Sequence, residues 1–554
     1  MLQERIKQVF HQRKAIAVGS FVFSFALSLS FVLGIQLKYI GYTWGGVKGK
    51  IAIIAVSVIL SVIIEPFIYM FTECIEKLKF KKQNLEAGGN RVFFISFIGI
   101  FVSWVPHYLA FWPAIMSYDF NAQYVSARSG LDAFTTHHPL MHTFLIRQFL
   151  LLGDLLGSPE IGMSLFALTQ MVILASIMAC SCQLIARITG SNKWGFIGAA
   201  FFAIFPTHPI MSVCMTKDVL FSAFFLLFTI SMIKLSFCDT GKNNSKKIIF
   251  CIIAGVLTML FRNNALYAFV VFSPIYVLLS GKKWIRSLVV SLSIIALSLV
   301  LLSGSKAIFK AGSGSEIEKY SVVLQTFART GLNHGETLSQ KEYEIIDYYV
   351  PAELWSSYNP GIADNIKVCV ADTFSRWEND KIKLFRDWIY IGLRYPNDYL
   401  DAILTLTCGY WSIPDETHTN VWGNGMETGT GLISTFNASS TEKFEFIDEV
   451  SYISWLKTLD KKLVNDDVYL KVPVISILFK PAFYCWVLIY VLISSICLKK
   501  KKACMVALWP ILYLCTLLLG PVVNYRYVYP LLISLPIMCA YFLHDESCGK
   551  LVGK

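Results

Sequence analysis

The stretch MSYDFNAQYVSARSGLDAFTTHHPLMHT, residues 116–143, concentrates side chains that can exchange protons. It contains Asp119, His137, His138 and His142, and it directly follows an apolar run that is long enough to cross a bilayer. A carboxylate with apolar surroundings can keep a raised pKa and accept a proton from a substrate. Asp119 is therefore a candidate general base, and the alternative is an N-cap for the helix that follows.

The three histidines allow two interpretations. His138 and His142 have i,i+4 spacing, which places two imidazoles on one helical face, as in some metal sites. Pro139 between them suits the first turn of such a helix. No HExxH pattern and no matching Cys/His set accompanies them. We therefore expect no metal site and assign His137 and His138 to the lining of a substrate pocket.

Charged residues also interrupt the apolar sequence at three later turns. Lys217 and Asp218 lie in MTKDVLF, Arg262 in LFRNNAL, and Arg526 with Tyr527 in NYRYVYP. An arginine at membrane depth requires a counter-charge, and a phosphate or a carboxylate fits best. The simpler alternatives are a helix end meeting water for Lys217 and Asp218, and a snorkelling anchor for Arg526.

The composition defines the class of protein that must position these groups. Of 554 residues, 55% are hydrophobic and only 16% are charged, which is typical of a polytopic membrane protein. The formal net charge of +12 does not indicate a nucleic-acid partner, because the basic residues stand in short connections between apolar runs.

A bilayer core requires roughly 20 apolar residues per helix, so we predict an all-α polytopic membrane protein with about twelve transmembrane helices. The expected spans are 15–35, 51–72, 92–115, 161–186, 194–214, 218–237, 248–262, 264–281, 284–303, 481–498, 503–520 and 526–543. The pair at 248–281 is short. The apolar stretch 140–157 follows Pro139 and contains Arg147, so we expect a helix lying at the membrane interface.

The charge pattern predicts which connections face which side. Lys and Arg are concentrated in the N-terminal stretch and in every second connection between spans. By the positive-inside rule, both termini are then in the cytoplasm. The turns that carry Asp119, Lys217, Arg262 and Arg526 then face outward. The long segment 304–475, in which acidic residues outnumber basic ones, faces outward with them.

Three regions follow from this topology. Residues 1–303 form an N-terminal transmembrane region with the catalytic outer loop 116–143. Residues 304–475 form a mainly helical extracytoplasmic domain between the ninth and tenth spans, and residues 476–554 form a C-terminal transmembrane region. Within the outer domain we expect helices at 379–394 and 396–409 and a Gly/Thr-rich loop at 412–442. A disulfide between Cys369 and Cys408 is an open alternative.

Several of these stretches resemble the GT-C superfamily of membrane glycosyltransferases, in particular bacterial proteins related to protein O-mannosyltransferases and aminoarabinose transferases. The likeness is carried by PAIMSYDFNAQ with HHPLMHT, TKDVLFSAFFLLF, LFRNNALYAF and PVVNYRYVYPLLISLP. In the outer segment it is carried by YSVVLQTFAR, which contains Gln325 and Arg329, by YNPGIADNIK and by YPNDYLDAILTLTCGYW. It covers roughly residues 90–543.

The resemblance implies a metal-independent, inverting glycosyltransferase without a cofactor, in the plasma membrane of a bacterium. It would move a sugar from a polyprenyl-phosphate donor, a membrane lipid, to a glycan, a teichoic-type polymer or a protein of the cell envelope. Asp119 matches the position of the catalytic base. The residues expected at the substrates are His137, His138, Lys217, Asp218, Arg262, Arg526, Tyr527, Gln325 and Arg329. One departure is that two spans precede the span leading to Asp119, where the superfamily usually has one.

Two other classes of function remain open. A transporter or flippase of lipid-linked glycans would carry functional polar groups along its spans and toward both leaflets. A non-catalytic scaffold for wall assembly would tolerate the loss of Asp119 or Arg262.

Overall fold

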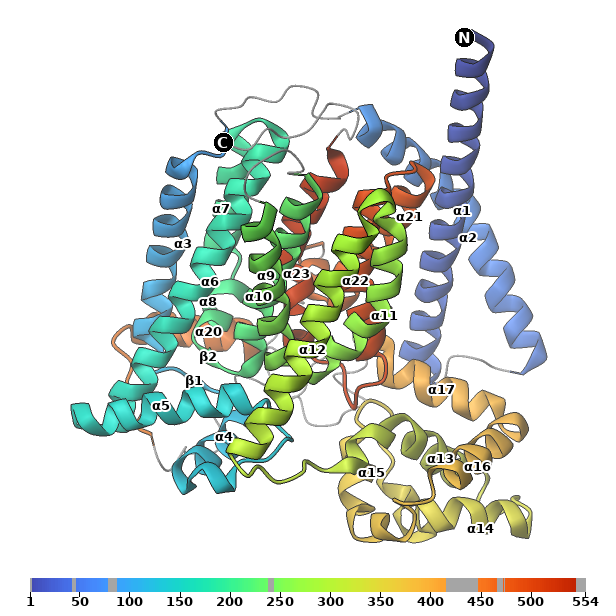
Figure 1. Cartoon of the computed structure of the whole chain (residues 1–554). Coiled ribbons are helices and arrows are strands. Elements are labelled where there is room, and N and C mark those ends of the chain that lie inside the picture. The colour runs from blue at the N-terminus through green and yellow to red at the C-terminus, as the bar shows by residue number, and fades with distance from the viewer. Residues whose placement is uncertain are drawn as a thin grey trace.

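The computed structural model describes residues 2–41, 46–77, 87–237, 244–414, 447–465, 472 and 474–544. Long helices form an upright bundle, and a layer of shorter helices covers its lower end (Figure 1). Helix α1 begins and α23 ends at the upper face, opposite α13–α17 (Figure 1). Most of the predicted loop at 412–442 falls outside the described residues.

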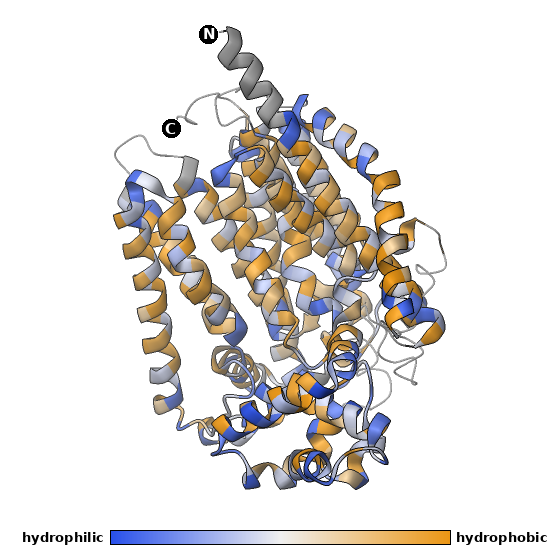
Figure 2. Cartoon of the chain, turned by 90° about the vertical axis from the view of Figure 1, so that its right-hand side faces the viewer, coloured by the Kyte–Doolittle hydropathy of each residue, from blue (hydrophilic) through white to orange (hydrophobic). Residues whose placement is uncertain are grey.

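Among the described residues, seven helices are long and apolar enough to cross a membrane. They are α1 (Leu2–Ile40), α2 (Val47–Lys77), α3 (Asn90–Ala110), α6 (Pro159–Thr189), α9 (Lys217–Phe237), α12 (Trp284–Ile308) and α23 (Tyr525–Leu543). Apolar residues predominate along the bundle and hydrophilic residues gather toward its ends (Figure 2). The fold is therefore that of a multi-pass membrane protein, as the composition predicts.

Shorter helices complete the bundle. They are α7 (Asn192–Ile204), α10 (Asn244–Phe261), α11 (Asn263–Leu279), α21 (Pro481–Cys497) and α22 (Lys501–Leu517). The expected continuous span at 194–214 is wrong. Helix α7 ends at Ile204 and a separate helix, α8 (Thr207–Ser212), follows. The break falls at Phe205, which is extended because the next residue is Pro206. The total of twelve crossings stays a prediction.

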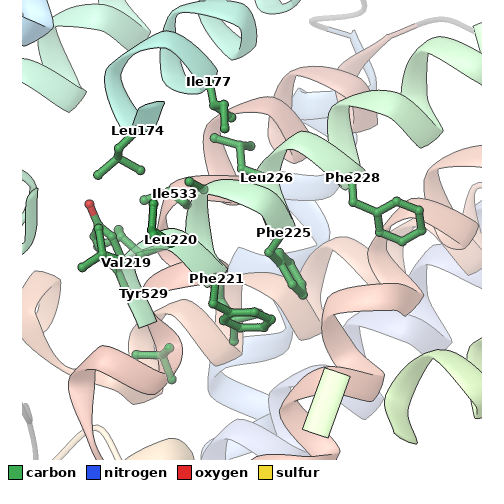
Figure 3. Close-up of a cluster of buried hydrophobic side chains, with 14 of the residues drawn as sticks. Leu174, Ile177, Val219, Leu220, Phe221, Phe225, Leu226, Phe228, Tyr529 and Ile533 are labelled. Atoms are coloured by element: carbon green, nitrogen blue, oxygen red, sulfur yellow. The ribbon is translucent and has the colours of Figure 1, made fainter. Parts of the chain in front are cut away.

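Helix α9 lies at the centre of the bundle, and most of its apolar window is buried. Figure 3 shows Leu174 of α6, Leu220 of α9 and Tyr529 of α23 in one buried cluster. Phe225 on the same helix stacks on Trp509 of α22, with ring centroids 5.1 Å apart. Helices from both halves of the chain therefore pack against α9 and fix the position of its N-terminal end.

Two short extended segments pair at the lower end of the bundle. Strand β1 (Ile115–Met116) pairs in parallel with β2 (Cys214–Met215). Each strand leads directly into a helix, β1 into α4 (Tyr118–Ser129) and β2 into α9. The pairing therefore sets two helix N-termini side by side.

Helix α5 (Leu140–Leu156) follows α4 and the short 3-10 helix η1 (Leu131–Ala133). It lies across the lower end of the bundle instead of along it (Figure 1). Its last turn exposes Leu155 and Leu156. This placement agrees with the predicted interfacial helix at 140–157.

The layer of short helices at the lower end of the bundle falls within the expected outer domain, and we keep that name for it. It has a hydrophobic core of its own, which includes Leu324, Tyr349 and Trp377. Its helices are η3 (Glu316–Tyr320), α13 (Ser321–His334), α14 (Gln340–Tyr349), η4 (Ala352–Ser357), α15 (Asp364–Cys369), η5 (Ala371–Arg376), α16 (Lys381–Arg394), α17 (Pro396–Thr407) and η6 (Cys408–Tyr410). The predicted helices on either side of Pro396 are confirmed.

The end of the expected outer domain packs with the bundle. Helix α20 (Ser454–Asn465) lies against α3, where His107 Nδ1 and Asp460 Oδ2 are 2.8 Å apart. The last short element before α21 is η8 (Ile475–Phe479). Cys369 is exposed and Cys408 is buried, and the structure does not join them in a disulfide.

Helices α5 and α6 approach each other through glycine. A Cβ added to Gly162 of α6 would lie only 3.0 Å from the Cα atom of Gly153 in α5. The same Cβ would overlap the carbonyl oxygen of Phe149. Backbone atoms cannot move aside as a flexible side chain can. The close contact of α5 with α6 therefore depends on the absence of a side chain at Gly162.

We predict that Gly162→Ala destabilises the protein by about 2 kcal/mol, because overpacking forces α5 away from α6. The measurement is the thermal melting temperature of the detergent-purified protein. Gly304→Ala is the matched control, since a Cβ on Gly304 of α12 meets nothing within 4 Å. An unchanged melting temperature in Gly162→Ala would show that the two helices can separate freely.

Candidate functional site

The site is built where helix N-termini converge. The β1–β2 pairing places Ser117 beside Met215, whose carbonyl accepts a hydrogen bond of 2.6 Å from the Ser117 hydroxyl. Asp119 is the second residue of α4, and Lys217 is the first residue of α9. Two residues 98 positions apart in the sequence therefore face each other at the start of their helices.

The Asp119 carboxylate lies between two cations. Its Oδ2 atom is 3.0 Å from Lys217 Nζ and 3.1 Å from Arg526 Nη2. The N-cap position of α4 is occupied by Ser117, and Asp119 lies inside the first turn. The carboxylate is thus part of an ion network, and the alternative of a simple helix cap is not what the structure shows.

The expectation of a raised pKa for Asp119 is wrong. Burial favours the neutral acid, but the charges of Arg526 and Lys217 outweigh burial and hold the pKa of the carboxyl well below its usual value. Asp119 is therefore ionised and, with both cations in place, a weak base.

A second carboxylate lies behind the first. Asp218 is fully buried and pairs with the guanidinium of Arg262. It also accepts a hydrogen bond of 3.2 Å from the Thr216 hydroxyl and lies 3.6 Å from Arg526 Nε. The alternative of a helix end meeting water is therefore wrong for Asp218.

The side chains of Arg262 and Arg526 are also buried and in contact with several neighbours. Arg262 is the N-cap residue of α11, and its guanidinium lies 4.4 Å from the centre of the Tyr527 ring. Arg526 is only 6% exposed and joins both carboxylates. A snorkelling anchor would reach toward water, so that alternative is wrong for Arg526.

These residues form what we term the charge cluster, which consists of Asp119, Lys217, Asp218, Arg262 and Arg526. Three cations face two carboxylates, so the charge cluster carries an excess of one positive charge. The helix dipoles add to it, because its members stand at the N-terminal ends of α4, α9, α11 and α23. The Nε atom of Arg526 has no hydrogen-bond partner within the described part of the chain. The site is arranged to receive an anion.

The histidines take different roles around the charge cluster. His138 Nδ1 lies 3.2 Å from Lys217 Nζ, and His137 packs edge-on against the His138 ring. Burial and the charge of Lys217 lower the pKa of His138 to about 3, so the ring is neutral and accepts from Lys217. His142 is fully buried and contacts Gln123 Oε1 at 3.2 Å. In the described residues, no group of His, Cys, Asp and Glu could hold a metal ion.

Among the described residues, the partners of Gln325 and Arg329 lie outside the charge cluster. Arg329 Nη2 lies 3.3 Å from Asp401 Oδ2 inside the outer domain. Gln325 donates a hydrogen bond of 2.8 Å to the carbonyl of Asn359. The turn after Asn359 contacts the bundle, where the Ala363 amide donates to the carbonyl of Pro521 at 2.8 Å. Gln325 therefore supports the surface that meets the segment leading to Arg526.

Sequence reasoning missed a supporting residue in α6. The Gln170 side-chain amide donates to the carbonyls of Ser212 and Cys214 at 2.9 and 3.0 Å, which holds the chain in place before α9. Gln170 is buried inside an apolar helix. A polar residue in the middle of a predicted span was the available signal.

The fold and the charge cluster define a multi-pass membrane protein with a group of charged residues, positive in sum, at one end of its bundle. Residues 122–550 match a family described as a family of unknown function (DUF6020), and the chain belongs to this family. The match includes Lys217, Asp218, Arg262 and Arg526 and begins three residues after Asp119. Neither a curated protein nor a solved structure matches the chain.

We predict that Asp119→Asn lowers stability at neutral pH by about 3 kcal/mol, because the buried Arg526 and the partly exposed Lys217 lose a shared partner. The pKa of Asp119 is depressed in the folded protein. Its contribution is therefore complete above the usual aspartate pKa of about 4 and is lost as the pH falls below it. The gap in melting temperature between wild type and variant should be widest near neutral pH and should close in acid.

The control for this titration is Asp132→Asn, which changes an exposed acid of η1 in the same outer loop. Its melting curve should follow that of the wild type at each pH. A gap for Asp119→Asn that stays constant as the pH falls would contradict the ion pairing of Asp119.

Proposed function

We propose that the protein is a glycosyltransferase that moves a sugar from a polyprenyl-phosphate donor to an acceptor of the cell envelope. The observation that carries this proposal is the charge cluster: two buried arginines and the partly exposed Lys217, with one carboxylate, Asp119, on its partly open side. A phosphodiester supplies the missing negative charge, and the lipid chain of the donor suits a site at the end of membrane helices.

The transfer exchanges one bond for another. An acceptor hydroxyl oxygen attacks the anomeric carbon and forms the new glycosidic bond, while the bond from that carbon to the phosphate oxygen breaks. The hydroxyl proton passes to the Asp119 carboxylate. The leaving polyprenyl phosphate keeps the electron pair and the added negative charge, which Lys217, Arg262 and Arg526 stabilise. Attack from the face opposite the phosphate inverts the anomeric configuration.

The low pKa of Asp119 fits this scheme once the donor is bound. Lys217 and Arg526 hold the carboxylate ionised in the ligand-free site. A bound phosphate draws hydrogen bonds from the same two cations, which weakens their hold on Asp119. The pKa of Asp119 then rises, and the carboxylate becomes a stronger base when the acceptor is present.

The location and cellular side belong to the same proposal. We place the charge cluster and α13–α17 on the outer face of a bacterial plasma membrane and both termini in the cytoplasm, with about twelve crossings of the bilayer. The acceptor is a glycan, a teichoic-type polymer or a protein. No step calls for a metal ion. A flippase is the alternative, and the grouping of five charged residues at a single end of the bundle favours the enzyme.

We predict that Asp119→Asn reduces transfer by about 100-fold or more, because the acceptor loses its general base. The measurement is the release of free polyprenyl phosphate from a polyprenyl-phosphate sugar by the protein in nanodiscs. Asp132→Asn should transfer at the wild-type rate. Turnover of Asp119→Asn at that same rate would end the assignment of Asp119, and movement of intact donor without release would favour a flippase.

We predict that polyprenyl phosphate raises the melting temperature of the wild type and that Lys217→Ala weakens this effect. Loss of one charge-assisted hydrogen bond costs about 1.5–3 kcal/mol, which weakens binding by roughly tenfold or more. Lys319→Ala is the control, since Lys319 is an exposed cation of the outer domain. Equal stabilisation of Lys217→Ala and Lys319→Ala would remove Lys217 from the phosphate site.

A further inference from the structure

Helix α16 of the outer domain exposes a stripe of large apolar side chains. Ile382, Phe385, Ile389 and Leu393 follow one another at intervals of three, four and four residues, which keeps them on one helical face. Their exposed fractions are 86%, 51%, 53% and 78%. An exposed helix face is normally polar, so this stripe requires an occupant.

The core of the outer domain does not use this stripe. Leu384 and Ile391, on the other face of α16, are buried in the outer-domain core, and Trp388 packs partly against it. Helix α16 is therefore apolar on two faces. Within the described part of the chain, only one of these faces is covered.

The charges beside the stripe are positive. Lys381 and Arg386 are exposed at its edges, whereas Arg394 pairs with Glu342 of α14. Asp387, the acidic residue of α16, is buried and accepts a hydrogen bond of 3.0 Å from the Tyr349 hydroxyl. An apolar stripe flanked by basic side chains is the pattern of a helix that lies in a membrane interface and meets anionic headgroups.

The position of α16 places this stripe at the edge of the bilayer. Asn397, three residues after the end of α16, accepts a hydrogen bond of 2.6 Å from Lys50 Nζ in the first turn of α2. Helix α2 is a candidate span whose apolar window is only 17% buried, and Val47 and Ile51 beside Lys50 are exposed apolar residues. In Figure 1 α17, which begins beside Asn397, lies at the lower ends of α1 and α2.

We propose that the exposed face of α16 inserts into the outer leaflet and that its flanking basic residues bind anionic lipid headgroups. A second copy is a poorer occupant, because a twofold contact through this face would bring Lys381 and Arg386 against their own copies. This lipid contact is independent of the proposed transfer reaction, whereas the choice of the outer leaflet rests on the membrane topology proposed with that function.

The test is photocrosslinking in the full-length protein. Ile389 is replaced by the photoreactive residue p-benzoylphenylalanine, and Phe385 is replaced in the same way in a second variant. Both are reconstituted in nanodiscs of phosphatidylcholine, with or without phosphatidylglycerol. Glu344 is the control position, because it is exposed on α14, which lies at the bottom of the outer layer in Figure 1. Adducts are identified by mass spectrometry after irradiation.

We expect phospholipid adducts at positions 389 and 385 severalfold above those at position 344, with phosphatidylglycerol enriched over its share of the nanodisc. Replacing Lys381 and Arg386 with Ala should remove that enrichment and leave adducts with phosphatidylcholine. Crosslinks between two protein chains would overturn the proposal in favour of self-association. Lipid adducts no more frequent at 389 and 385 than at 344 would also overturn it.

Discussion

The structure depends on the mutual neutralisation of charges that are buried at one end of a membrane bundle. An ionised side chain removed from water is tolerated only when a counter-charge and hydrogen bonds replace its hydration. Asp218 has no exposed surface, and Arg526 has very little. Each therefore requires the other helices to be in place, so the charge cluster also specifies how α4, α9, α11 and α23 meet.

That requirement explains several structural features which otherwise look incidental. The two-residue pairing of β1 with β2 is too short to contribute much stability by itself, yet it sets the N-termini of α4 and α9 side by side. Gln170 holds the chain just before α9 with two hydrogen bonds. These contacts act in concert to bring the Asp119 carboxylate to the Lys217 ammonium, which secondary structure alone would not achieve.

The sequence allowed the members of the charge cluster to be predicted one at a time but not their partners. Charges beside apolar spans stand out in any sequence, and so Asp119, Lys217 and Arg526 were visible. Their pairing depends on a contact between residues 98 positions apart, which no local pattern encodes. The predicted direction of the pKa shift of Asp119 was wrong for the same reason. Local reasoning detects the apolar surroundings of the carboxylate but not the two cations that face it.

The helical architecture was easier to predict, because apolar length determines it directly. The break after α7 shows the limit of that approach, since hydropathy continues across Pro206 although the helix does not. The outer domain shows another limit. Gln325 and Arg329 belong to a stretch that carries the family resemblance, yet Arg329 is committed to Asp401 within the domain. The resemblance to glycosyltransferases predicted substrate contacts for both residues, a prediction that did not take account of the ion pair between Arg329 and Asp401.

One short path links the outer domain to the charge cluster. Its turn at 359–363 contacts Pro521 and Val522, and the chain reaches Arg526 only four residues later. If the outer domain rests on the bilayer through α16, the lipid contact fixes its height above the membrane on one side. The turn at 359–363 fixes that height on the other side. A movement of that domain would then be transmitted to the helix end that carries Arg526. Admission of an acceptor beneath the domain and the electrostatic environment of Asp119 would therefore change together.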